Sequence, residues 1–248
     1  MRLNWYNISI YLSGIVLMFV LWWLFTMDSS SSLHRFNPKG TFVAFGELLN
    51  NPRYWESVLE TMKRLIGGLA IATVIGIPLG LITGYFLRLH QLTYVPFQFI
   101  RMISPLSWTP VAIIVFGIGS GPVYFLISIA AVWPVLLNTA AGVHAADKLW
   151  VQVARSLGAN DRGILKHILL RASLPHVLTG IQLALGVSWI VLVPAEMLGV
   201  SSGLGYMILD YRDINGYDSI MAIILTIGML GLLTDLPLRR LVKHFRWN

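Results

Sequence analysis

The sequence contains no cysteine. This absence excludes disulfide bonds, iron–sulfur clusters and thiolate zinc sites. The six histidines are scattered, and none forms an H-E-x-x-H pair, so we expect no metal centre. A G-x-x-x-x-G-K-[ST] motif is also missing, so the chain has no P-loop for nucleotide phosphates. We therefore expect no catalytic residues and no cofactor in this chain.

Charged residues are also scarce. Only 12% of the 248 residues are charged, 56% are hydrophobic and the mean hydropathy is +0.71. These values lie far outside the usual composition of soluble proteins. A bilayer core of roughly 30 Å requires about 20 apolar residues per helix. The composition therefore predicts an all-α, polytopic membrane protein.

Six segments are apolar enough to be read as transmembrane helices. The first has no charged residue, and Met27-Asp28 and a serine run follow it instead of a small-x-small cleavage site, so we expect it to be uncleaved. The third has a polar lead-in from Leu92. The six predicted spans are Ile8 to Met27, Leu65 to Leu87, Ile103 to Ile118, Val123 to Ala141, Pro175 to Leu198 and Ser219 to Leu233.

Basic residues predict the orientation. Six crossings place both termini on one side, and cytoplasmic loops are enriched in Lys and Arg. With the N-terminus in the cytoplasm, the inner segments hold twelve of the 18 basic residues and the outer segments hold six. This asymmetry accounts for the net charge of +7 without a nucleic-acid partner. The outer six are Arg35, Lys39, Arg53, Lys63, Arg64 and Arg212.

Small residues recur every four positions in two of the spans. Such stripes allow the backbones of neighbouring membrane helices to approach closely, so they predict a packed bundle. The stripes are Gly68, Ala72, Gly76, Gly80 and Gly84 in the second span, and Gly180, Ala184 and Ser188 in the fifth.

A basic, polar segment, residues 142–174, interrupts the hydrophobic sequence after the fourth span. Trp150, Val151, Ala154 and Leu157 are predicted to share one helical face, and Gly158 follows where a left-handed C-terminal cap would fall.

A second helix is expected to start after this glycine. Asn160 or Asp161 is positioned to cap it, and an apolar stripe would then lie opposite basic residues. Two interpretations are open: an amphipathic pair lying on the anionic inner leaflet, or a socket for a soluble partner. The stripe is Ile164, Leu165, Ile168 and Leu169, opposite Arg162, Lys166 and Arg171.

The residues of this segment resemble a family. The stretch "QVARSLGAN…ILLRASLP" is similar to the loop E-A-A-x-x-x-G, nine residues, I-x-L-P of ABC importer permeases. Ala154, Gly158 and Ile168 fall on that spacing, and Pro175 matches a proline of the subgroup for nitrate, sulfonates, taurine and bicarbonate. The resemblance extends from about Leu65 to the end through "SPLSWTPVAIIVFGIG", "PVLLNTAAGV" and "AEMLGVSSGLGYMI".

The resemblance implies a type I ABC importer permease fold in a bacterial inner membrane. It implies two ABC ATPase subunits that carry ATP and Mg, a second copy of this permease, and a solute-binding protein outside. Residues 1–64 would be a first helix and outer loop, and residues 65–248 a five-helix core with coupling loop 142–174. The ATPase-coupling residues would be Gln152, Ala154, Arg155, Leu157, Gly158 and Ala159.

The chain also departs from the family pattern. Gln152 and Val153 stand where the motif has Glu-Ala, and Arg171 stands at its first proline. An exposed ion pair contributes only about 0 to 1 kcal/mol, so we expect docking to be weakened but kept.

Polar groups within the spans are candidates for the translocation path, because polar side chains facing lipid are costly. Each is equally able to bridge two helices. Glu196 in particular is either functional or paired with a loop arginine or a backbone donor. Arg101, at the expected inner start of the third span, either extends to the headgroups or attracts an anion. The candidates are Trp108, Asn138, Gln182, Ser188, Trp189 and Glu196.

Two other classes are weighed against an importer for a small anion. An ATP-independent secondary transporter or channel usually has more ionisable groups at midplane and often inverted repeats. A membrane enzyme needs a catalytic constellation, which one intramembrane Glu does not supply. The sequence does not identify the solute.

Overall fold

The structure, a computed structural model, describes residues 5–28 and 32–245, with side chains from Ser13 on apart from Ile15 and Ser32. No strand is assigned in these ranges. The helices are α1 (Trp5–Thr26), η1 (Ser32–Phe36), α2 (Pro38–Leu49), α3 (Pro52–Tyr85), α4 (Leu87–Met102), η2 (Pro105–Trp108), α5 (Thr109–Phe116), α6 (Ser120–Ala145), α7 (Lys148–Ser156), α8 (Asp161–Gly163), η3 (Ile164–Leu169), α9 (Leu170–Gly199), α10 (Leu204–Asp213) and α11 (Tyr217–Phe245).

Four unbroken helical runs are long and apolar enough to cross a membrane. They are α3, α6, the run Asp161–Gly199 and α11. They confirm the second, fourth, fifth and sixth predicted spans. The first predicted span falls on α1, where Val16–Thr26 forms a shorter apolar helix and part of the span lies outside the described side chains. The count of six therefore stays a prediction.

The third span differs from its prediction. We expected one helix from Ile103 to Ile118, but α4 ends at Met102 and the following pair η2–α5 turns away by 86°. The break falls at Ile103 and Ser104, which have extended ψ angles of 127°. Pro105 causes it, because proline disfavours the helical conformation in the preceding residue. The two helices qualify as a span only as a bent pair.

The central packing joins α3, α6 and α9. A Cβ atom added to Gly76 would lie 2.9 Å from the Val135 Cβ, and one added to Gly84 would lie 2.8 Å from the Val143 Cβ. The backbones of α3 and α6 are therefore close enough that only small residues fit between them. Gly180 approaches α6 in the same way. These contacts confirm both predicted small-residue stripes.

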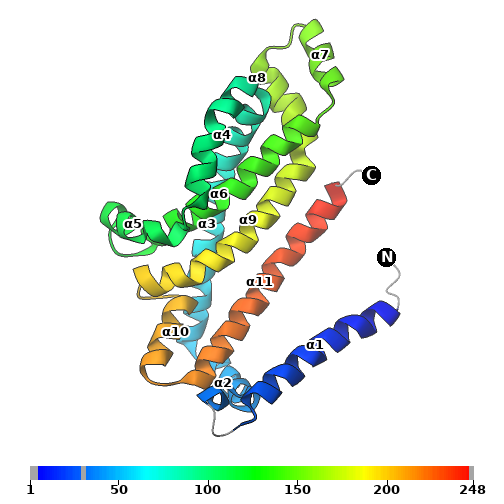
Figure 1. The fold of residues 1–248 in the computed structure, drawn as a ribbon. Coiled ribbons are helices and arrows are strands. Elements are labelled where there is room, and N and C mark those ends of the chain that lie inside the picture. Colours follow the sequence, from blue (N-terminus) through cyan, green and yellow to red (C-terminus); the bar gives the residue numbers. More distant parts are fainter. Residues whose placement is uncertain (1–4, 29–31, 246–248) are drawn as a thin grey trace.

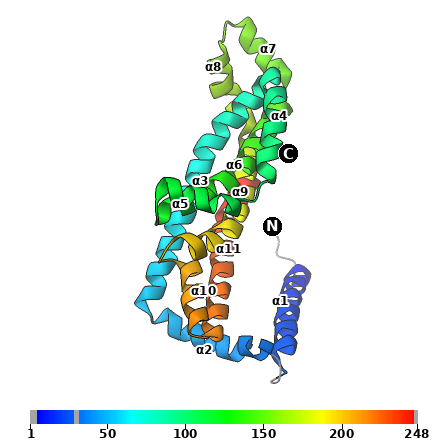
Figure 2. The same cartoon turned by 60° about the vertical axis from the view of Figure 1, so that its left-hand side comes forward.

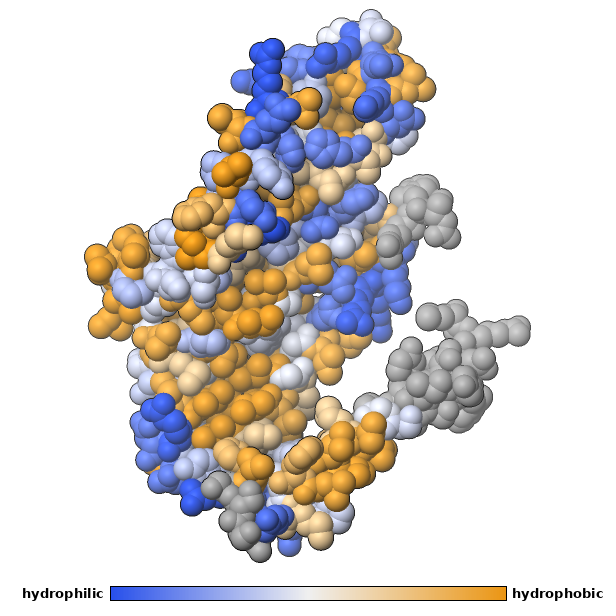
Figure 3. Space-filling model, in the orientation of Figure 1, coloured by the Kyte–Doolittle hydropathy of each residue, from blue (hydrophilic) through white to orange (hydrophobic). Residues whose placement is uncertain are grey.

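The molecule is elongated, and its two ends carry different elements. Figures 1 and 2 show α7 and α8 at one end and α2 and α10 at the other. Helix α1 stands apart from the bundle, and its described residues pack against η1 and α2, at the α2 end. In Figure 3, hydrophilic residues gather at the α7 end, while hydrophobic residues cover much of the middle of the face shown. This distribution fits a protein whose middle lies in lipid.

The spans on either side extend into the segment 142–174. Helix α6 continues to Ala145, and α8 starts one unbroken helical run from Asp161 to Gly199. The predicted second helix therefore leads directly into the fifth span, through the π-helix η3. The predicted division at residues 64 and 65 falls within α3, so the N-terminal part leads into the core along one helix.

Candidate functional site

Helix α7 is a capped helix that protrudes from one end of the bundle (Figure 1). The Asp147 side chain caps its start by accepting a hydrogen bond of 2.8 Å from the Leu149 N–H. At its end, Gly158 has φ +82° and donates to the Arg155 carbonyl, and the Ala159 N–H donates to the Ala154 carbonyl. This pair of bonds is a Schellman cap. It confirms the predicted left-handed cap at Gly158.

The faces of α7 are arranged differently from the prediction. Val151 and Ala154 pack against the buried cluster Leu81, Val143, Ile164 and Leu169, which also confirms the predicted apolar stripe of the second helix. Trp150 and Leu157, predicted to share their face, are exposed instead. The prediction failed because two adjacent faces of this short helix are apolar. The outer apolar face consists of Leu149, Trp150, Val153 and Leu157.

Arg155 fastens α7 to the bundle. Its Nη2 donates to the Tyr85 hydroxyl at 2.7 Å, and that hydroxyl donates to the Asp161 Oδ1 at 2.7 Å. The same guanidinium lies 3.4 Å from the Asp161 carboxylate. The hydrogen bond to Tyr85 raises the pKa of Arg155. Asn160, rather than Asp161, caps α8 through a 2.8 Å bond from the Gly163 N–H. Gln152 is exposed.

A cleft of about 430 Å³ opens between α4, η2, α6 and α9. It brings together two of the predicted path residues, Trp108 and Asn138. Arg101 and Trp133 also line it. The size is typical of a site for a small ligand, and its walls are mostly apolar with a few polar groups.

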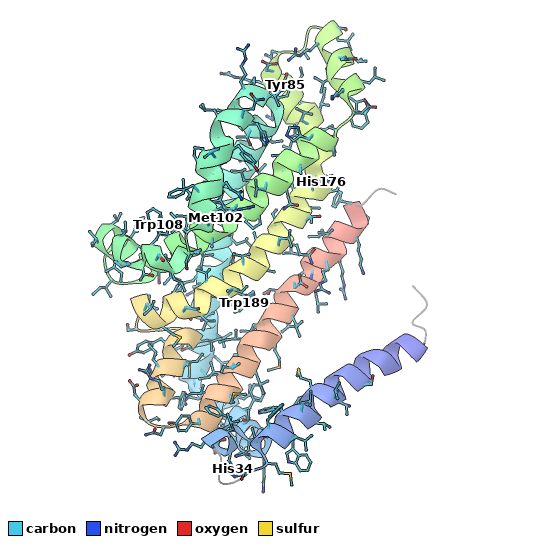
Figure 4. The ribbon with its side chains drawn as sticks, in the orientation of Figure 1. His34, Tyr85, Met102, Trp108, His176 and Trp189 are labelled. Atoms are coloured by element: carbon cyan, nitrogen blue, oxygen red, sulfur yellow. The ribbon has the colours of Figure 1, made fainter. Side chains whose placement is uncertain are left out.

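Three other predicted path residues bind within or between helices. The Gln182 amide donates to the Asp235 Oδ1 at 3.0 Å, and the Trp189 indole donates to the Thr234 hydroxyl at 3.1 Å, so both join α9 to α11. Figure 4 shows Trp189 on α9 where that helix passes α11. Ser188 is buried, and its hydroxyl donates to the carbonyl four residues earlier. For Gln182 and Trp189 the structure contains the helix-bridging alternative, whereas the bond of Ser188 stays within α9.

Glu196 lies in a buried polar cluster. Its carboxylate is 2.8 Å from the Arg64 Nη1, and it also accepts hydrogen bonds from the Thr61 hydroxyl and the Gly205 N–H. The Arg64 and Glu196 side chains are 3% and 0% exposed. Glu196 was predicted either to be functional or to pair with an arginine or a backbone donor, and in the structure it pairs with both Arg64 and the Gly205 N–H. Arg64 itself was assigned to the outer loop, but it lies inside α3.

The sequence analysis missed Thr61, Arg64 and Ser202 as members of this cluster. Arg64 also donates to the Ser202 carbonyl and hydroxyl, at 2.8 and 2.6 Å. The one available signal was a single acid and a single base, each close to the end of an apolar segment. Their pairing spans 132 residues of sequence, and sequence periodicity does not reveal such a contact.

A bundle of long apolar helices with a cleft and a protruding capped helix is typical of a multi-pass membrane protein. The chain belongs to the family described as binding-protein-dependent transport system inner membrane component, whose model matches residues 76–247. It is thus the permease subunit of an ABC importer.

Several known proteins are similar to this chain. The bicarbonate transport system permease protein CmpB of Synechococcus elongatus is 33% identical over 238 residues, covering 90% of this chain and 84% of that protein. The nitrate import permease protein NrtB of Leptolyngbya laminosa is 32% identical over 182 residues, covering 73% and 65%. A solved structure of the MetNI methionine ABC transporter, in an inward-facing conformation, matches with a TM-score of 0.65 at 19% identity, covering 79% of this chain and 99% of that chain.

Proposed function

We propose that this permease imports a small anion of the nitrate or bicarbonate class, driven by ATP hydrolysis on two separate ABC ATPase subunits. Two copies of the chain would form the path, and a solute-binding protein would deliver the solute at the α2 and α10 end. ATP and Mg²⁺ would bind to the ATPase subunits. The names of the bicarbonate and nitrate relatives support the solute class.

One observation carries the proposal: α7 protrudes at one end and presents an outer apolar face. Leu157 is 82% exposed on this face. An exposed apolar patch on a protruding element is typical of a protein interface. The contacts of Arg155 with Tyr85 and Asp161 would transmit a displacement of α7 to α3 and to the run that continues as α9. The ATPase would therefore move the bundle through α7.

The orientation is tested by labelling. Because the natural chain has no cysteine, Ser156→Cys and Asp213→Cys each introduce one thiol at opposite ends of the bundle. In inside-out vesicles we expect a membrane-impermeant maleimide to label Ser156→Cys, and in right-side-out vesicles to label Asp213→Cys. The reverse pattern would place α7 outside the cell and rule out an ATPase contact there.

Leu157→Ser tests the coupling surface. We expect this variant to fold and insert normally but to copurify at least 10-fold less ATPase, because it removes the most exposed apolar side chain of the proposed contact surface. Ile214→Ser is the matched control, since Ile214 is 71% exposed at the opposite end. Copurification from membranes, quantified against permease yield, measures both. Equal ATPase recovery for Leu157→Ser and the native chain would contradict the coupling role of α7.

A further inference from the structure

The cleft between α4, η2, α6 and α9 carries a single charge. Arg101 is its one charged lining residue, and no carboxylate of the described part of the chain lines it. Resting on the function proposed above, we propose that this cleft binds the transported anion directly. In this proposal, Arg101 supplies the charge that selects it.

Arg101 lies much deeper than the sequence indicated. We expected it at the inner start of a helix, where its side chain would extend to the headgroups. Instead α4 starts at Leu87, beside the α7 end, and Arg101 follows Leu87 by 14 residues. At about 1.5 Å per residue, this distance is roughly 21 Å along the helix. Figure 4 shows the neighbouring Met102 near Trp108, at mid-height of the bundle.

An arginine at this depth requires a polar environment, because a charged side chain facing lipid is costly. The hydrogen bond from its Nη2 goes to the Gln98 Oε1, at 3.0 Å. Gln98 is neutral, so this bond leaves the positive charge uncompensated. A guanidinium has five N–H donors in a planar fork, and this bond uses one. The charge and the remaining donors are available to a ligand in the cleft.

The other lining groups suit a small planar oxyanion. A guanidinium binds two oxygens of one planar anion through parallel N–H bonds. Asn138 lines the same cleft from α6, and its bond to the Pro134 carbonyl uses one of the two hydrogens of its amide nitrogen. The second hydrogen is a donor for a third oxygen. Trp108 and Trp133 form apolar walls that limit the space.

The test uses the assembled complex in proteoliposomes, with ATPase and solute-binding protein, and isotope-labelled nitrate and bicarbonate as probes. We expect Arg101→Gln to lower uptake at least 10-fold, although the variant complex contains as much ATPase per permease as the native complex. Arg101→Lys, which keeps the charge and loses the fork, should retain part of the uptake. Arg88→Gln is the matched control, because it removes the same charge from the first turn of α4, away from the cleft. Native uptake by Arg101→Gln would overturn the proposal.

A second variant keeps the arginine. Leu183 lines the cleft from α9, so Leu183→Glu would place a carboxylate there to compete with the anion. We expect it to lower uptake, with Leu183→Gln less affected. If the Arg101→Gln complex does not assemble, Leu183→Glu and Leu183→Gln still test the proposal. Native uptake by both Leu183 variants would overturn it. A native complex that imports neither probe with ATP contradicts the proposed function instead, so the two failures are distinguishable.

Discussion

Replacing Glu196 by alanine is expected to lower the free energy of unfolding by about 3–5 kcal/mol, the usual cost of removing one partner from a buried ion pair. The reason is the charge that would remain. Arg64 is 3% exposed, and its Nη1 lies 2.8 Å from the Glu196 carboxylate. Without that carboxylate, the buried guanidinium would keep hydrogen bonds to Ser120 and Ser202 and one carboxylate, that of the partly exposed Glu60, at 3.9 Å. The Gly205 N–H would also lose its acceptor.

The double variant Arg64→Met with Glu196→Leu separates this effect from ordinary packing. Apolar replacement of both partners of a buried pair is often neutral or stabilising, so we expect the double variant to be more stable than Glu196→Ala. Arg53→Ala is the control, because Arg53 lies on α3 like Arg64 but forms an exposed ion pair, with Asp210 of α10. It should cost at most about 1 kcal/mol. Unfolding in mixed detergent micelles measures all three.

If the free energy of unfolding of Glu196→Ala were within about 1 kcal/mol of the native value, the cluster would not stabilise the fold in the way proposed. The expected consequence of the cluster is local. It ties α3 to the connection between α9 and α10, because Thr61 bonds both to Glu196 and to the Leu204 N–H at 2.9 Å. The cluster would therefore hold α3 against α9 and α10 at the α10 end of the bundle.

Replacing Gly80 by leucine is expected to disrupt the packing of α3 against α6. A Cβ atom at Gly80 would lie 2.5 Å from the Leu136 carbonyl oxygen and 2.6 Å from the Thr139 Cβ. A backbone oxygen does not move aside as a flexible side chain does, so the helices themselves must separate. Overpacking typically costs 1–3 kcal/mol, and we expect about 3 kcal/mol here.

Gly186→Leu is the matched control, because a Cβ at Gly186 on α9 has no atom within 4 Å. We expect its midpoint of thermal unfolding in detergent to remain near that of the native chain, while the midpoint of Gly80→Leu falls. Equal midpoints for the two leucine variants would show that α3 and α6 separate without cost.

Much of the fold follows from local patterns. Long apolar runs predicted six spans, and four of them are confirmed as unbroken helices. The four-residue repeats of small side chains predicted close contacts with neighbouring helices, and α3 and α9 make these contacts with α6. The cap at Gly158 was also predictable, since a glycine after a helical pattern favours a left-handed conformation. The break in the third span was missed, although Pro105 was visible, because the apolar run continues past it.

The candidate site was less predictable. The sequence identified polar groups within apolar spans but not their partners. Gln182 and Trp189 bind α11, Glu196 binds Arg64, and only Trp108 and Asn138 meet in the cleft. Each of these outcomes depends on how helices distant in sequence are rotated against one another, and one-dimensional periodicity does not contain that information.

By itself, the sequence determined the class of protein. Its hydrophobicity, the spacing of its small residues and the motif around Gly158 are local properties, and each has a local physical cause. Only the tertiary structure decided which charges are buried and which face a cleft. Arg64 and Arg101 both lie in apolar helices, yet one is neutralised by a carboxylate and the other is not, because the fold brings an acid to one and a cleft to the other.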